Sequence, residues 1–349
     1  MSRERDFSMD FVRVWAAALV IAVHFIAHTG FYDQPLIGPT MAVYAWLRML
    51  FLPCVPLFLM LSGYFCIERR WSRGHLRGLL KVLLVYLLAA VLCLLFRAYW
   101  MKEPMRFSDA LKMILAFTAA PYGWYVAMYA GLYLLMPFLN TLWRALTGRE
   151  RGILLLVLLL LVSLPAVTNL TFQILPDWWI PLYPAAYYLL GAWLREPPER
   201  LTRLRGGWLL LGWLVPAAAA AALRWVFAEG GTFTWMSYVD YNSPFVVAEA
   251  LCAFSLLRRF RGTRLPAMAR RAVSRAARLS LPIFLLSYIF DSLLYPVLNG
   301  RFPTLKGRLP FLPLIVLAVL LCSALLGQAV DAAAGALLRL LPERERSKE

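Results

Sequence analysis

Long runs of apolar residues, separated by short polar segments rich in arginine, extend along almost the whole chain. A helix that crosses a bilayer needs about 20 largely apolar residues. The pattern predicts an all-α protein, a polytopic transmembrane bundle of about ten spanning helices. They are expected at residues 9–29, 44–66, 77–99, 122–143, 152–168, 178–194, 207–228, 244–260, 279–298 and 310–335.

Other segments complete the expected organisation. The stretch from Phe107 to Ala120 is too short to span and is expected to lie in the interface or to re-enter the membrane. The first apolar run has no small-residue cleavage site and is longer than a signal core, so it is expected to be retained. Residues 1–341 are predicted to form a single membrane-embedded domain, followed by a charged cytoplasmic tail at 342–349.

The basic residues predict the orientation of these helices. If the N-terminus is cytoplasmic, the cytoplasmic segments hold 26 Lys and Arg residues and the outer segments hold seven. Cytoplasmic loops carry the excess of Lys and Arg in membrane proteins. Both termini are therefore expected in the cytoplasm, with the bundle in the cytoplasmic (inner) membrane.

The composition excludes a soluble domain. Hydrophobic residues make up 62% of the chain and charged residues 16%, and one soluble core could not bury so much apolar surface. The net charge of +17 lies in short segments between apolar runs, without a basic groove with interleaved aromatics, so no nucleic-acid partner is expected. The five cysteines have no metal-ligand spacing, so they are expected to be buried thiols and no metal is expected.

Three polar side chains interrupt the first apolar run, and their spacing places two of them on one face. Arg13 and His24 are eleven residues apart, which is about three helical turns with ~20° left over and ~16 Å along the axis. Ala17 and Val20 lie between them on that face. Asp10, three residues before Arg13, can pair with it and is also a candidate cavity residue.

This stripe has a functional and a structural interpretation. A cation at the cytoplasmic mouth can hold the phosphates of a cytosolic cofactor, and a histidine deeper in the membrane can act as a general base on a hydroxyl. Alternatively, Arg13 extends to lipid phosphates and His24 satisfies a buried carbonyl. The spacing alone leaves both open.

Beyond the first helix, the order of several motifs resembles the membrane-bound acyltransferase type 3 family, whose members acylate sugars. The D-x-x-R-x10-H pattern from Asp10 to His24 is similar to the family's first-helix signature. Four later stretches are also similar to family segments: VPLFLMLSGY at 55–64, GWY at 123–125 with GLYLLMP at 131–137, YLLGAWL at 188–194, and the turn YNSP at 241–244.

The resemblance implies an O-acyltransferase that moves an acyl group, most often acetyl, from cytosolic acyl-CoA to a hydroxyl of a cell-surface glycan or its lipid-linked precursor. Acetyl-CoA is then the expected donor, and the glycan, the acyl-CoA and membrane lipid are the expected partners. His24 is implied as the catalytic base and Arg13 as a partner of the donor's charged groups. Ser62 and Gly63 are implied to shape the same cavity.

The chain departs from the family pattern in two places. The R-x-x-R that often precedes the third helix is replaced by Gly78-Leu-Leu-Lys81 with Arg77 adjacent, so Arg77 and Lys81 are the candidate donor-binding cations there. The Y-L-x-H stretch of the ninth helix reads Phe284-Leu-Leu-Ser287, and Asp291, one turn further, is a candidate replacement for the missing histidine.

Several weaker candidates have an ordinary structural alternative. Trp124 and Tyr125 can stack on a sugar or adenine, or form part of an interfacial aromatic belt. Glu249 is an intramembrane carboxylate and so a candidate cavity residue, unless it pairs with a buried cation. His28 can contact the acceptor and His75 the donor, or each can be an interfacial or solvated histidine.

Two other classes of protein fit the same polar features. A transporter or flippase of lipid-linked sugars also needs a polar cavity, but the chain shows no repeats and no helices broken at matched positions. A non-catalytic membrane sensor would bind acyl-CoA or lipid without transferring anything. Replacing His24 by Ala distinguishes these classes from an enzyme.

Overall fold

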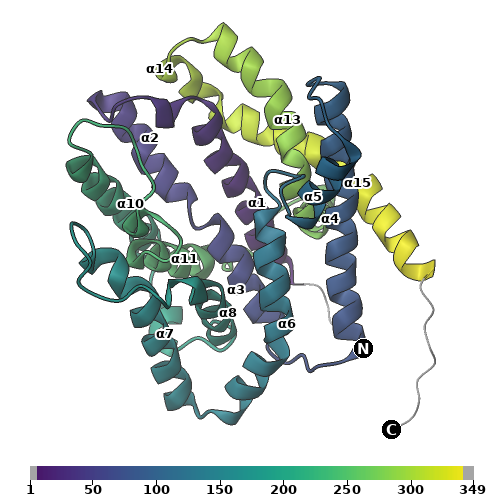
Figure 1. The fold of residues 1–349 in the computed structure, drawn as a ribbon. Coiled ribbons are helices and arrows are strands. Elements are labelled where there is room, and N and C mark those ends of the chain that lie inside the picture. The colour runs from purple at the N-terminus through teal and green to yellow at the C-terminus, as the bar shows by residue number, and fades with distance from the viewer. Residues whose placement is uncertain (1–5, 341–349) are drawn as a thin grey trace.

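The computed structural model describes residues 6–340, and within that range its regular structure is helical apart from an isolated bridge between Pro35 and Thr232. Apolar composition drives this result, because a helix satisfies every backbone polar group within its own segment in lipid. The helices are α1 (Phe7–His28), α2 (Gly38–Phe51), α3 (Cys54–Cys66), α4 (Arg73–Tyr99), α5 (Phe107–Leu115), α6 (Trp124–Ala145), α7 (Gly148–Thr168), α8 (Tyr183–Trp193), α9 (Glu199–Arg203), α10 (Gly206–Ala228), α11 (Pro244–Leu257), α12 (Ala267–Arg278), α13 (Ser280–Arg301), α14 (Leu305–Arg308) and α15 (Leu312–Leu340) (Figure 1).

Helix is present at each of the ten predicted segments, but fewer segments are long enough to cross a membrane. Within the described residues, eight are both long and apolar enough. The other two are α8, with 11 residues, and α11, with 14 residues. At 1.5 Å per residue they extend ~16 and ~21 Å, so the count of ten spanning helices stays a prediction. The expected tail at 342–349 lies outside the described residues.

The predicted helix at 44–66 is in fact two helices with a break. α2 ends at Phe51 and α3 begins at Cys54, with Leu52 and Pro53 between them. Pro53 has no backbone N–H to continue the hydrogen-bond ladder, and its ring clashes with the preceding turn. Both halves are largely buried, so the break lies inside the protein.

Two further short helices, α5 and α12, lie outside the spanning set. α5 has nine residues and none of them is buried, which confirms that the region after Phe107 does not span. α12 is a basic amphipathic helix that the apolar pattern did not indicate, because only its Ala277 is buried. It packs against α1, where the Ser274 hydroxyl donates to Asp10 at 2.7 Å.

Glycines hold α3 against α8 at unusually close range. A Cβ atom on Gly63 would lie 1.7 Å from the carbonyl oxygen of Tyr188, and one on Gly191 would lie 1.9 Å from that of Met60. Small residues at crossing points allow two membrane helices to approach closely. This contact fixes the position of α3, which runs antiparallel to α1 in the interior of the bundle (Figure 1).

We call the end of the bundle at which α1 and α4 begin and α3 ends the basic end. Arginines cluster there, in the connections that follow α3, α8 and α11. Two contacts join these connections to their neighbours: Arg195 to Glu68 at 2.7 Å, and Arg258 to the carbonyl oxygen of Leu194 at 2.6 Å. The opposite end is where α1 ends at His28 and α13 ends at Arg301.

Candidate active site

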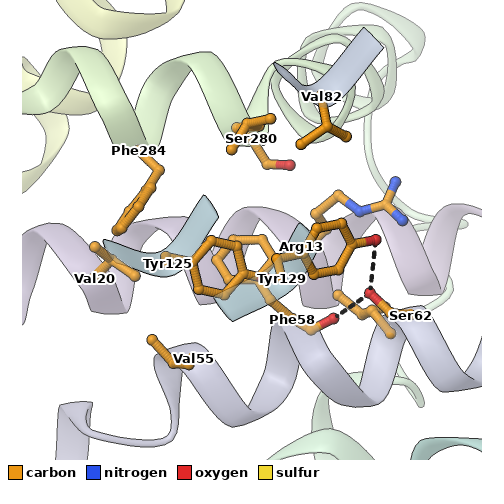
Figure 2. A pocket seen from close by; sticks show the side chains of 12 residues that line it. Arg13, Val20, Val55, Phe58, Ser62, Val82, Tyr125, Tyr129, Ser280 and Phe284 are labelled. Atoms are coloured by element: carbon orange, nitrogen blue, oxygen red, sulfur yellow. Dashed lines mark hydrogen bonds between the residues drawn. The ribbon is translucent and has the colours of Figure 1, made fainter. Parts of the chain in front are cut away.

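A cavity of about 200 Å³ lies between α1, α3, α4, α6 and α13. Figure 2 shows its lining side chains, which are mostly apolar, with Arg13 the charged one among them. The lining consists of Arg13, Val20, Val55, Phe58, Leu61, Ser62, Val82, Tyr125, Tyr129, Ser280, Leu281 and Phe284. Three predicted site residues, Arg13, Ser62 and Tyr125, are therefore brought together around one space.

The end of the cavity nearer the basic end is polar. The Ser62 hydroxyl donates to the carbonyl oxygen of Phe58 at 2.9 Å and lies 3.4 Å from the Tyr129 hydroxyl. Arg13 lies beside this pair in Figure 2, with its guanidinium 5.4 Å from the centre of the Phe65 ring. A cation with hydroxyls beside it suits an anionic or strongly polar part of a ligand.

Val20 and Phe284 line the other end of the cavity (Figure 2). His24 follows Val20 by four residues on α1, so its side chain lies one turn further along the same face. It is not among the cavity-lining residues, and its ring lies 6.5 Å from that of Phe284. Arg13 and His24 thus share a face as predicted, but the cavity stops one turn before His24, at Phe284.

His24 lies beside a carboxylate and stacks on an aromatic ring, and its buried Nδ1 atom has no hydrogen-bond partner in the structure. Its Nδ1 atom lies 3.6 Å from the Oδ2 atom of Asp291 on α13. The Tyr122 ring stacks on the imidazole with 3.7 Å between centroids, and its hydroxyl donates to the same Asp291 oxygen at 2.8 Å. Asp291 is completely buried, so its carboxylate depends on these neighbours in place of water.

His28 extends this group towards the opposite end of the bundle. Its Nε2 atom lies 3.0 Å from the Tyr122 hydroxyl, and its ring stacks on Tyr295 at 4.9 Å. Because the tyrosine proton is engaged by Asp291, the hydroxyl oxygen accepts a hydrogen bond from His28. The side-chain amide of Asn299 donates to the His28 carbonyl oxygen at 2.9 Å and fixes the end of α1.

This arrangement can prepare His24 as a base. A carboxylate beside Nδ1 favours the tautomer with its proton on Nδ1, so the lone pair is on Nε2. The same carboxylate stabilises the imidazolium that forms when Nε2 takes a proton. The site can therefore accept a proton from a hydroxyl and return it to a leaving group.

Several predicted cavity residues have structural contacts elsewhere. Asp10 accepts from Ser274 of α12, and Gly63 packs on α8. Trp124 is 41% exposed and stacks on Tyr241. Glu249 is fully buried in α11, and neither of its carboxylate oxygens has a hydrogen-bond partner there. None of these four lines the cavity.

Two of the three cations expected to bind the donor, Arg77 and Lys81, are directed to α15. Arg77 donates to the carbonyl oxygen of Leu338 at 3.0 Å, and the Lys81 ammonium lies 2.9 Å from Asp331. His75 was expected to be solvated or to contact the donor. It is only 3% exposed, and its Nε2 atom lies 2.8 Å from the carbonyl oxygen of Tyr133.

Sequence reasoning missed Tyr122 and understated Asp291. Asp291 was recognised as a carboxylate inside an apolar run, and such a residue usually indicates a functional position. Tyr122 lies in the turn before α6, where an aromatic residue is ordinary for an interfacial belt. Within the described residues, no group of His, Cys, Asp and Glu side chains has the geometry of a metal site, and the five cysteines are free.

The fold and the site define a multi-pass membrane protein in which a histidine–carboxylate pair lies next to a cavity that runs towards the half-buried Arg13. The chain belongs to the acyltransferase type 3 family, because the family model described as an acyltransferase domain matches residues 6–327. Membership supports an acyltransferase activity in general terms. Comparison with curated proteins and with solved structures gives no match.

Proposed function

We propose that this protein is an integral membrane O-acyltransferase that uses acyl-CoA, with acetyl as the expected acyl group. The acceptor is a hydroxyl of a cell-surface glycan or of its lipid-linked precursor. In this proposal the basic end faces the cytoplasm and both termini lie there, in the cytoplasmic membrane. The excess of Lys and Arg at that end supports this orientation.

The relationship between the cavity and His24 carries the proposal. The lining begins at Arg13 and ends at Phe284, one helical turn before an imidazole whose Nδ1 atom faces Asp291. A donor with its charged part at Arg13 would place its reactive end next to His24. From Arg13 to His24 the rise is ~16 Å, and the pantetheine arm of CoA equals about four extended residues, or ~14 Å.

The reaction follows from these positions. The Nε2 atom of His24 takes the proton of the acceptor hydroxyl as its oxygen attacks the thioester carbonyl carbon. The new C–O bond forms, the C–S bond breaks, and the CoA thiolate takes the proton back from the imidazolium. Asp291 and Tyr122 position the ring and stabilise its positive charge, and they touch neither substrate.

Replacement of His24 by Ala tests the proposal. Cells that lack the gene are supplied with either the wild-type or the variant chain, and their surface glycans are compared by mass spectrometry. The wild-type chain should restore an acyl mass on the glycan, and the His24 variant should not. Val23→Ala, one residue away on another face of α1, is the matched control and should restore it. Full acylation by the His24 variant would overturn the proposal.

One observation favours the transporter alternative. The break between α2 and α3 at Pro53 resembles the discontinuous helices from which transporters build their substrate sites. The same experiment separates the two functions. A transporter without His24 would alter the amount of glycan at the surface, whereas an acyltransferase without His24 would leave the amount unchanged and remove the acyl group.

A further inference from the structure

A second hollow, of about 820 Å³, opens at the basic end beside the start of α1. Four arginines line it: Arg258 at the end of α11, Arg259 and Arg261 in the connection that follows, and Arg270 on α12. Among the described residues, Asp6 is the carboxylate in its lining, and the Ser8 amide donates to it at 3.0 Å. The hollow therefore has a clear excess of positive charge.

The inside of the hollow holds a polar group without a partner. Ser255 lines it, is 4% exposed, and its hydroxyl has no hydrogen-bond partner in the structure. A buried hydroxyl without a partner is costly, and a ligand oxygen would satisfy it. Some of the arginines are fixed in place: Arg258 lies over the Tyr64 ring at 5.8 Å, and Arg259 donates to the Thr202 carbonyl oxygen at 3.2 Å.

The hollow and the cavity follow one another along the same two helices. On α1, Met9 lines the hollow and Arg13, four residues later, lines the cavity. On the antiparallel α3, Tyr64 lines the hollow and Leu61 lines the cavity. The linings of the two spaces are thus four residues, or ~6 Å, apart on α1, and two residues, or ~3 Å, apart on α3, where Ser62 also lines the cavity.

Of the three cations expected to bind the donor, Arg13 lines the cavity, whereas Arg77 and Lys81 line neither space. Arg77 and Lys81 contact α15, through Leu338 and Asp331. The described lining of the hollow, in contrast, supplies four guanidinium groups, which are well suited to phosphate because they donate in a planar fork.

We propose that this hollow binds the phosphate-bearing nucleotide part of the acyl donor, while the cavity takes its pantetheine arm. The inference rests on the proposed function for the identity of the donor. Arginines on the α11–α12 connection contact the phosphates, the Ser255 hydroxyl donates to the ligand, and Arg13 lies at the start of the arm. The phosphate headgroup of an anionic lipid has similar chemistry and is the competing occupant.

The test measures CoA binding by the purified full chain, without any need for turnover. Arg261 and Arg270 are exposed and are replaced together by Ala, while Arg271→Ala provides the matched control because Arg271 is also exposed but does not line the hollow. The double variant should bind CoA about 10- to 100-fold more weakly, because each lost charged contact is worth about tenfold. Arg271→Ala should bind it as the wild type does.

A second ligand identifies the phosphate. Dephospho-CoA, which lacks the 3′-phosphate, should bind the wild type more weakly than CoA, and this difference should shrink in the double variant. Thermal unfolding of each variant verifies that the fold is intact. A double variant with the charge-retaining replacements Arg261→Lys and Arg270→Lys should recover part of the CoA affinity.

Two results would overturn the proposed site. The first is equal CoA affinity in the wild type and the double variant, and the second is a loss that appears with Lys81→Ala instead. If the double variant keeps its CoA affinity but loses binding of phosphatidylglycerol, a lipid headgroup occupies the hollow. In these cases acyl transfer from CoA is still possible, whereas a wild-type chain that binds no CoA would end both proposals.

Discussion

The Nδ1 atom of His24 on α1 lies 3.6 Å from the Oδ2 atom of Asp291 on α13, although the two residues are near opposite ends of the sequence. α1 and α13 pack side by side, and Asp291 is completely buried at their contact. A buried carboxylate beside an imidazole fixes the ring's tautomer and prepares its other nitrogen for proton transfer. Three predictions concern this pair and the cavity beside it, and a fourth concerns the close contact of α3 and α8.

Replacement of Asp291 by Asn should slow acyl transfer strongly. Asn keeps the shape of the side chain but removes the charge that stabilises the imidazolium, so we expect a fall in kcat of about 10²- to 10⁴-fold. Donor binding should be unchanged, because Asp291 does not line the cavity. The measurement is acyl transfer in proteoliposomes, with Asp331→Asn on α15 as the control, and a normal rate in the Asp291 variant would contradict the role of the pair.

Replacement of Tyr122 by Phe should have a smaller effect in the same direction. The ring remains to stack on His24, but Asp291 loses its 2.8 Å hydrogen bond. A hydrogen bond to a charged group is worth about 1.5–3 kcal/mol, so the rate should fall about 10- to 100-fold. Tyr295→Phe is the matched control, because the buried Tyr295 hydroxyl has no hydrogen-bond partner in the structure. Equal rates for the two variants would show that the Tyr122 hydroxyl has no part in the reaction.

Replacement of Phe284 by Leu should change the preference for acyl chain length. Phe284 ends the cavity one turn before His24, and its ring lies 5.5 Å from that of Tyr125. A smaller side chain leaves room beside His24 for a longer acyl chain. The ratio of the rate with butyryl-CoA to the rate with acetyl-CoA should rise about 10-fold, which is the discrimination that one or two methylenes give in an apolar pocket.

The control for this substitution is Phe290→Leu, on another face of the same helix. Its ratio of butyryl to acetyl transfer should equal that of the wild type. A Phe284 variant with an unchanged ratio would mean that the acyl group does not pass this side chain.

Replacement of Gly63 by Ala should destabilise the protein. The added Cβ atom would lie 1.7 Å from the Tyr188 carbonyl oxygen, so α3 and α8 must separate. Overpacking of this kind costs about 1–3 kcal/mol, which should lower Tm in detergent by several degrees. Gly131→Ala on α6, where a Cβ atom meets nothing within 4 Å, should leave Tm unchanged or raise it slightly. If both variants melt at the same temperature, the close contact of α3 and α8 does not limit stability.

The helices were predictable because their cause is local. Each apolar run must form its own backbone hydrogen bonds in lipid, so hydropathy indicated where the helices lie. The ends of the helices were harder to predict, because hydropathy does not show where a proline or a turn interrupts an apolar run. Pro53 divides one apolar run into two helices, and α8 and α11 are shorter than their apolar runs suggested. α12 was not predicted, because it is basic and lies outside the apolar runs.

The sequence by itself determined that this is a helical membrane protein, which face of α1 carries Arg13 and His24, and, through its motifs, the acyltransferase family to which it belongs. Those properties depend on composition and helical period, which neighbouring residues set. Only the tertiary structure decided that Asp291 and Tyr122 meet His24, that Phe284 separates it from the cavity, and that Arg77 and Lys81 face α15. These contacts join residues far apart in the chain, and they are set by how whole helices rotate and pack against one another.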